Sequence, residues 1–329
     1  MKENVCLPRL SIGCLGGTVS MQRQLPGHGV TPRLGCNELL ADLPHLGSLA
    51  QLRASTLCLL PSASLTFPIM LEVLAWARGE VAQGAHAVVL TQGTDTLEES
   101  AYFLHLLWPF ETPLVMTGAM RDADQPGNDG PGNLLAAVQV ALADESRGRG
   151  VQVVLNDQIH AATRVRKTAS LAMAAFESPG AGPEGVVVEG KAIYRRPAVA
   201  RKVLQQPQRR EHRVALLEAC LDADSTLLQA IPALGYEGLV VAGFGAGHVS
   251  IAWAQALARI AQDMPVIMAT RTGSGPTARA SYGFEGGEID LQSKGVHMAG
   301  DLCPRKCRML LWLLIGLDNQ SALPGWLPH

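Results

Sequence analysis

Short apolar runs alternate with longer amphipathic stretches along the first half of the chain. The apolar runs are rich in Val, Ile and Leu and occupy residues 11–14, 56–60, 87–91, 113–117 and 151–155. A helical repeat of apolar positions is clearest at residues 69–83, 97–107 and 133–144. This alternation predicts βαβ units, and therefore a parallel sheet with helices on both of its faces.

The pattern begins again after residues 195–213, a segment rich in Arg and Gln that we interpret as an exposed linker. Beyond it, we expect strands at residues 214–217, 238–242 and 266–269 and helices at residues 225–231, 250–263 and 304–315. The sequence therefore predicts two α/β domains. The larger N-terminal domain, with a parallel sheet, covers residues 1–194, and the smaller C-terminal α/β domain covers residues 214–329.

Composition narrows the class of protein. Hydrophobic residues make up 47% of the chain and the net charge is −2, which favours a packed core and argues against nucleic acid as a partner. Residues 1–10 contain no apolar stretch after their charges, and the run at 309–317 is shorter than the ~20 residues that span a bilayer. The seven cysteines are scattered and include no metal-ligand pattern. We therefore expect a cytoplasmic protein without membrane segment, disulfide framework or metal.

In open parallel sheets, functional groups collect at the carboxyl ends of the strands. The first apolar run leads into Gly16-Gly17-Thr18, where paired glycines allow a sharp turn and the close approach of a ligand. The glycine spacing does not fit G-x-G-x-x-G, which argues against a dinucleotide-binding dehydrogenase. By itself, this motif favours a simple turn that contains a threonine.

The third apolar run leads into Thr94-Asp95-Thr96. Asp95 with Glu98, or Thr96 with Glu99, has the spacing of a capping box, so these residues have a structural explanation as the start of a helix. A hydroxyl beside a carboxylate at a helix start also makes a polar site with outward-pointing N–H groups. Both interpretations remain open at this point.

Two further positions follow the fourth and fifth runs. Gly118-Ala119 could direct backbone N–H groups at a developing oxyanion. Lys167 comes eleven residues after Asn156. An isolated lysine is usually solvated, but a lysine in a cleft can act as a base. Each of these signals is weak on its own.

Together these segments resemble the bacterial-type L-asparaginase family. The likeness runs in order over essentially the whole chain, through residues 16–18, 93–99, 101–104, 115–121, 129–131, 153–157, 242–247, 271–275, 299–302 and 304–306. The Gly-Gly-Thr and Gly-Thr-Asp-Thr segments are highly specific when they occur together. The resemblance implies the same two-domain α/β fold, a homotetramer arranged as a dimer of dimers, and no metal or organic cofactor.

The resemblance also implies an activity, the hydrolysis of L-asparagine, a small amino-acid amide, to L-aspartate and ammonia through an acyl-enzyme. Thr18 matches the family's nucleophilic threonine. Thr94, Asp95 and Lys167 match its second threonine, its aspartate and its lysine, which relay the proton. Splitting the reaction into two steps through a covalent ester makes a poor electrophile such as an amide easier to cleave.

Substrate contacts follow from the same resemblance. Asp95 is expected to hold the α-ammonium group of the substrate, and Ser62 matches the serine that binds the α-carboxylate. The backbone of Ala119 matches the residue that helps to form the oxyanion hole. Gly17 and Gly93 complete the substrate-binding positions that we expect.

The loop after the first threonine departs from the family. Many members carry a tyrosine there, next to the threonine hydroxyl, but residues 19–34 contain none. Val30 falls near the expected position and His28 lies close by. Either His28 substitutes, since a histidine can act as a base near neutral pH, or it is an ordinary solvated loop residue.

The second domain departs from the family as well. The sequence of residues 245–248 is Gly-Ala-Gly-His where the family has Gly-Asn-Gly-Asn, so His248 replaces an asparagine that reaches the substrate from a neighbouring subunit. Glu288, or less favourably Glu285, matches the intersubunit glutamate. Gln92 stands where a histidine is common.

Several alternatives stay open from the sequence. Glutamine or another ω-amide could be the substrate, because one CH₂ group gives only ~1–3 kcal/mol of discrimination. The missing tyrosine is also consistent with a non-catalytic amino-acid-binding member, although such a protein would not need Thr18, Thr94 and Lys167. A tRNA-linked amidotransferase subunit is expected to carry an extra docking region, which the chain does not suggest.

Overall fold

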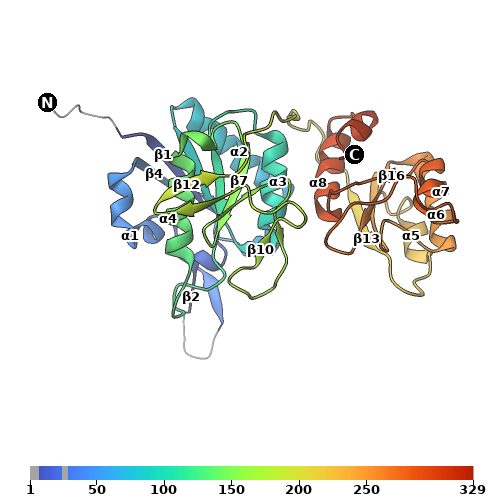
Figure 1. Cartoon of the computed structure of the whole chain (residues 1–329), viewed down its shortest axis with the longest axis horizontal. Coiled ribbons are helices and arrows are strands. Elements are labelled where there is room, and N and C mark those ends of the chain that lie inside the picture. The colour runs from blue at the N-terminus through green and yellow to red at the C-terminus, as the bar shows by residue number, and fades with distance from the viewer. Residues whose placement is uncertain (1–6, 24–28, 329) are drawn as a thin grey trace. The chain divides into compact units, whose positions relative to one another are not determined.

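The computed structural model describes residues 7–23 and 29–328, and the chain divides into two compact units between Val203 and Leu204 (Figure 1). The first unit contains an eight-stranded sheet in the order β12-β11-β8-β7-β6-β5-β1-β4. Its parallel strands are β1 (Arg9–Cys14), β4 (Gln51–Thr56), β5 (Ala87–Thr91), β6 (Leu114–Thr117) and β7 (Val151–Leu155). Antiparallel strands extend the sheet beyond β7, namely β8 (Gln158–Ala161), β11 (Gly185–Val188) and β12 (Lys191–Tyr194).

The longer helices of this unit are α1 (Cys36–Ala41), α2 (Phe67–Ala82), α3 (Leu97–Leu107) and α4 (Gly130–Leu142). Two short antiparallel pairs complete it, β2 (Met21–Arg23) with β3 (Val30–Pro32) and β9 (Arg166–Lys167) with β10 (Phe176–Glu177). Thr18–Ser20, Ser62–Ser64 and Thr94–Thr96 are 3₁₀ turns.

Helices cover both faces of the large sheet. Ile12, Val89 and Val115 pack in one apolar cluster with side chains of α1 and α4. Gly13 points to the opposite face, as neighbouring strand residues do, and there it lies beside Trp76 of α2. Strands β1, β5, β6 and β7 are therefore buried on both faces, which explains why their sequences are almost continuous apolar runs.

The strand expected at residues 56–60 is wrong. The strand is β4, which ends at Thr56, and it lies at the edge of the sheet, where its residues alternate between exposed and half-buried positions. The apolar residues that follow it cover the end of β1 instead, because the backbone N–H groups of Leu57 and Cys58 donate to the carbonyl oxygen of Cys14 at 2.8 and 3.3 Å.

The second unit has a four-stranded parallel sheet, formed in order by β13 (Val214–Glu218), β14 (Gly238–Gly243), β15 (Val266–Thr270) and β16 (His297–Met298). Its helices are α5 (Thr226–Ala230), α6 (Ile251–Asp263), α7 (Glu288–Ser293) and α8 (Pro304–Gly316). The prediction of a larger N-terminal and a smaller C-terminal α/β domain is therefore confirmed.

The segment interpreted as a linker is partly packed. His212 is buried, with its Nε2 2.7 Å from the carbonyl oxygen of Trp312 in α8 and the two rings stacked 4.7 Å apart. Burial lowers the pKa of His212. None of the helices within residues 7–23 and 29–328 has the length and apolar character of a membrane-spanning segment.

Candidate active site

The amine of Lys167 joins two residues that follow β5. Its Nζ lies 3.0 Å from Oγ1 of Thr94 and 2.7 Å from Oδ1 of Asp95. Lys167 comes from the short strand β9, whereas Thr94 and Asp95 belong to the 3₁₀ turn between β5 and α3. The side chain of Lys167 is 15% exposed and that of Asp95 is 70% exposed. The structure thus gathers a hydroxyl, an amine and an accessible carboxylate from segments more than seventy residues apart.

Glu98 fixes the backbone of Lys167. Its buried carboxylate accepts the backbone N–H of Lys167, with Oε2 and N 2.5 Å apart. The capping-box interpretation of this region fails for Thr96, which precedes α3 but makes no side-chain cap. The contact of Glu98 with Lys167 was not predicted from the sequence. No local pattern distinguishes Glu98, which is buried, from its neighbour Glu99, which is half-buried.

Thr18 follows two glycines that turn the chain at the end of β1. Gly16 and Gly17 have φ angles of 91° and 83°, in the left-handed region that favours glycine. A Cβ atom on Gly17 would lie only 2.1 Å from Cα of Gly93. The backbones of Gly17 and Gly93 therefore touch, and the next residue along each segment is a threonine, Thr18 or Thr94.

Ser62 lies against Gly93, the second of these two glycines. It is buried and begins a 3₁₀ turn. A Cβ atom on Gly93 would lie 2.9 Å from Oγ of Ser62 and 3.0 Å from Cα of Gly17. Three of the expected substrate-binding positions therefore lie in a row, with Gly93 in contact with Ser62 on one side and with Gly17 on the other.

Ala119 lies in a turn that polar side chains hold in place after β6. Nδ2 of Asn133 donates to the carbonyl oxygen of Gly118 at 3.0 Å, and Asp129 accepts the backbone N–H of Met120 at 3.0 Å. Asn133 also donates to Asp129 at 2.9 Å. The role of Asn133 was not predicted, because the helical pattern of residues 133–144 indicates only packing on the sheet.

The loop after Thr18 folds as the antiparallel pair of β2 and β3, in which Val30 is paired with Arg23. The backbone N–H groups of Arg33 and Leu34 both donate to the carbonyl oxygen of Ser20, at 2.7 and 3.0 Å. These bonds tie the far end of the loop to the turn that contains Thr18. His28 lies outside the described residues.

His248 and Glu288 pair with each other in the second unit. Nε2 of His248 is 3.1 Å from Oε2 of Glu288, and the other carboxylate oxygen accepts the backbone N–H groups of Ser281 and Tyr282, each at 2.6 Å. Burial raises the pKa of Glu288 but the backbone N–H groups lower it, and the net pKa is below its usual range. The alternative residue, Glu285, accepts a bond from Gln255 instead.

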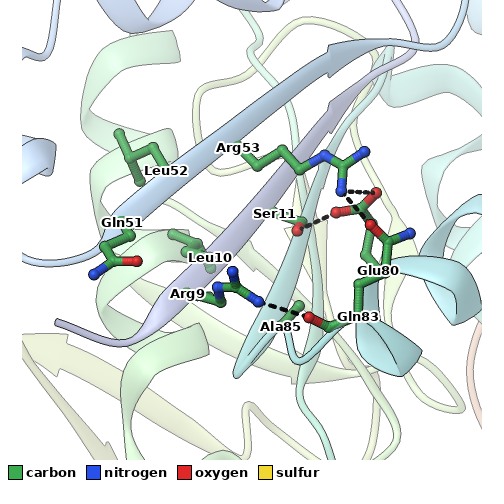
Figure 2. Close-up of a pocket in the computed structure, with 9 residues that line it drawn as sticks. All are labelled: Arg9, Leu10, Ser11, Gln51, Leu52, Arg53, Glu80, Gln83 and Ala85. Atoms are coloured by element: carbon green, nitrogen blue, oxygen red, sulfur yellow. Dashed lines mark hydrogen bonds and ion pairs between the residues drawn. The ribbon is translucent and has the colours of Figure 1, made fainter. Parts of the chain in front are cut away.

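A polar hollow of about 220 Å³ lies at the opposite, amino ends of β1 and β4 (Figure 2). Its buried carboxylate, Glu80, accepts the hydroxyl of Ser11 at 2.7 Å and lies 3.4 Å from Nη1 of Arg53. Arg9 donates to the carbonyl oxygen of Gln83 at the end of α2, at 2.7 Å. Since each of its charged groups already has a partner, we assign this hollow a structural role.

Within residues 7–23 and 29–328, no three side chains of His, Cys, Asp or Glu are grouped so that they could hold a metal ion. The Lys167 cluster itself offers a hydroxyl, an amine and a carboxylate group. Together with the backbone N–H groups of the neighbouring turns, these groups suit proton transfer and the stabilisation of an oxyanion.

The fold and this cluster define a two-domain α/β protein with a hydroxyl–amine–carboxylate site at the carboxyl ends of a parallel sheet. Residues 9–200 match the family model described as "Asparaginase, N-terminal", and residues 213–322 match "Glutaminase/Asparaginase C-terminal domain". The chain belongs to the asparaginase/glutaminase family, as the resemblance in its sequence indicates.

Individual relatives agree with this assignment. The chain is 36% identical to a probable L-asparaginase of Deinococcus radiodurans, over 94% of each sequence. It is 32% identical to a probable periplasmic L-asparaginase of Haemophilus influenzae, over 94% of this chain and 89% of the relative. The crystal structure of a probable cytoplasmic L-asparaginase from Campylobacter jejuni has a TM-score of 0.85 at 28% identity, over 95% of this chain and 98% of that one. These similarities support a hydrolase of the asparaginase or glutaminase-asparaginase type.

Proposed function

We propose that this protein hydrolyses the side-chain amide of L-asparagine to L-aspartate and ammonia, with Thr18 as the nucleophile. The observation that carries the proposal is the position of Nζ of Lys167, within hydrogen-bond distance of both Thr94 and Asp95. Family membership supports the class of reaction. The contact between Gly17 and Gly93 supports the participation of Thr18 in the same site.

The first step forms a bond between Oγ1 of Thr18 and the amide carbon. The hydroxyl proton passes through Thr94 to the amine of Lys167, which accepts it in the uncharged form, while the backbone N–H of Ala119 stabilises the new oxyanion. The C–N bond then breaks, and ammonia leaves with the relayed proton. Water attacks the remaining ester, which releases aspartate and restores the hydroxyl of Thr18.

The same site has groups for both charges of an α-amino acid. The carboxylate of Asp95, which is largely exposed, suits the α-ammonium group, and the hydroxyl of Ser62 suits the α-carboxylate. Glutamine differs from asparagine only by one CH₂ group, so a glutaminase-asparaginase is the alternative within the same mechanism.

We further propose that the protein is a homo-oligomer, a dimer of dimers, in which His248 and Glu288 of a neighbouring copy complete the site. Light scattering on the purified protein tests this assembly. We propose a cytoplasmic location, supported by the relative from Campylobacter jejuni that is named cytoplasmic. Another relative is named periplasmic, so fractionation of the native cells decides between the two.

The experiment that tests the activity is ammonia release from asparagine and from glutamine. Wild type, Thr18→Ala, Thr94→Ala and Lys167→Met are compared, with Thr226→Ala in the second unit as a matched control. We expect release by wild type and the control only. Acid quench during turnover followed by peptide mapping should find the ester on the peptide that contains Thr18. A wild type that binds aspartate but releases no ammonia from either amide would instead be a non-catalytic amino-acid-binding protein.

A further inference from the structure

Gln92 occupies a buried position between the turns of the candidate active site. It follows β5 directly, its side chain is fully buried, and its backbone N–H donates to the carbonyl oxygen of Thr117 at 2.9 Å. A Cβ atom on Gly118 would lie 2.4 Å from the carbonyl oxygen of Gln92, and one on Gly17 would lie 3.0 Å from its carbonyl carbon. The backbone of Gln92 is therefore held between the turns that follow β1 and β6.

The side-chain amide of Gln92 begins a directed chain of hydrogen bonds. Its Nε2 donates to the carbonyl oxygen of Gly93 at 3.3 Å and to the hydroxyl of Thr96 at 3.2 Å. A carbonyl can only accept, so the NH₂ end of the amide must face Gly93, which fixes the orientation of the amide. The hydroxyl of Thr96 then accepts from Gln92 and donates to the carbonyl oxygen of Ser62 at 3.0 Å.

This arrangement has a cost in stability. Oε1 of Gln92 is buried, and no hydrogen-bond partner for it is found in the described part of the chain. A buried acceptor without a partner is unfavourable, and an apolar residue of similar size would avoid that penalty. The contribution of Gln92 is therefore the two bonds donated by Nε2.

We propose that Gln92 is a positioning residue for substrate recognition, because it holds the Ser62 segment, through Thr96, against the turn of Thr94 and Asp95. The inference rests on the proposed function, in which Ser62 binds the α-carboxylate and Asp95 the α-ammonium group. These two substrate groups share one carbon atom, so the distance between them is fixed. The two turns that bind them must be held at a matching separation, and the Gln92–Thr96–Ser62 chain provides that link.

The Gln92–Thr96–Ser62 hydrogen bonds do not involve Lys167. Loss of these hydrogen bonds should therefore affect substrate binding more than the chemical step. A substitution that weakens binding of the substrate and of the transition state equally raises KM and leaves kcat unchanged. For Thr96→Val and for Gln92→Leu, we expect KM for asparagine and Kd for aspartate to rise about fivefold to tenfold, the size of one hydrogen bond. The double variant should be no worse than either single variant, because both changes cut the same chain.

The test measures KM, kcat, aspartate binding by calorimetry and amide hydrogen exchange of residues 62–65. Thr96→Ser keeps the hydroxyl and should keep the KM of wild type. Gln92→His keeps one ring N–H and should restore part of the loss seen in Gln92→Leu. Urea unfolding of each variant separates a local change from a general loss of stability.

Failure of the inference and failure of the proposed function are distinguishable. If wild type releases ammonia but Thr96→Val lowers kcat with an unchanged KM, or if the two single effects multiply in the double variant, the positioning role is wrong. If wild type releases no ammonia, the proposed function fails, and hydrogen exchange still decides whether the link exists. Faster exchange of residues 62–65 in both single variants supports the link, and unchanged exchange refutes it.

Discussion

Two ion pairs, Arg53–Glu80 and Lys167–Asp95, lie at opposite ends of the strands in the first unit. In one pair the acidic side chain is the buried partner, and in the other it is the basic side chain. At the amino ends the carboxylate is buried, since the side chain of Glu80 is 4% exposed and that of Arg53 is 57% exposed. At the carboxyl ends the amine is the more buried partner, with 15% exposure for Lys167 against 70% for Asp95.

The nature of the buried partner separates a structural pair from a reactive one. Arginine keeps its proton at physiological pH, so Arg53 can only neutralise the carboxylate of Glu80, which Ser11 also satisfies. Lysine can give up its proton, and the amine of Lys167 touches a hydroxyl. Asp95 in turn leaves most of its surface available to a ligand. An ion pair between a basic and an acidic side chain therefore stabilises the fold at one end of the sheet and suits proton transfer at the other.

The largest expected effect comes from replacing Lys167 by arginine. Lys167→Arg places a cation beside Asp95 but removes the amine that lies 3.0 Å from Oγ1 of Thr94. We expect ammonia release to fall by about 10²- to 10⁴-fold, the usual contribution of an acid–base group. The matched control, Arg53→Lys, should keep the kcat of wild type. Substantial activity in Lys167→Arg would show that this amine serves only to hold Asp95.

The next largest effect compares two glycines with left-handed backbones, one at each end of the sheet. The φ angle of Gly17 is 83°, and a Cβ atom added to it would lie 2.1 Å from the backbone of Gly93. The φ angle of Gly84 is 92°, but a Cβ atom added there would lie 3.5 Å from the side chain of Arg9. Gly17→Ala should displace the site by an ångström or more and lower kcat about 100-fold. Gly84→Ala bears the same backbone strain, about 1 kcal/mol, but should leave kcat unchanged.

Melting curves and ammonia assays on both glycine variants check this prediction. Equal losses of activity in Gly17→Ala and Gly84→Ala would mean that backbone strain alone matters, and that the contact between Gly17 and Gly93 does not shape the site.

A smaller effect is expected at the structural pair. Arg53→Met leaves the buried carboxylate of Glu80 with one partner fewer, which should destabilise the first unit by about 1–3 kcal/mol. The urea midpoint measures this loss, and Arg53→Lys should recover part of it. Because the pair lies at the amino ends of the strands, KM and kcat should stay at wild-type values. A change in kcat without a change in the urea midpoint would contradict the division between the two ends.

Periodicity predicted the fold well where strands are buried on both faces. The runs at β1, β5, β6 and β7 are almost continuously apolar, which makes their pattern clear. The edge strand β4 was misplaced because its residues are only partly buried. The antiparallel strands β8, β11 and β12 were not predicted, since such short segments at the end of a sheet carry little periodicity.

The candidate site was harder to predict than the fold. Thr94 and Asp95 stand at a strand end, where any parallel sheet places its functional groups. Lys167 lies on a strand of two residues, and no local pattern indicates that it returns to the end of β5. Lys167 could be predicted as a site residue only from the family resemblance. The contacts of Glu98 and Asn133 need three-dimensional information, because both are buried polar residues in helices whose sequences otherwise indicate only packing.

The smallest effect concerns a third carboxylate, Glu288 in the second unit, which is buried like Glu80 but pairs with a histidine. Burial raises its pKa, the backbone N–H groups of Tyr282 and Ser281 lower it, and the net pKa is below the ordinary value of 4.5. A carboxyl group whose pKa is lower in the folded than in the unfolded protein stabilises the fold at pH values above its unfolded-state pKa. That stabilisation is lost as the pH falls through the folded-state pKa. The urea midpoint of the second unit should therefore fall more steeply below pH 4.5 in wild type than in Glu288→Gln, which has no carboxyl group to protonate. Parallel curves for the two proteins would show that the buried carboxylate contributes nothing through its charge.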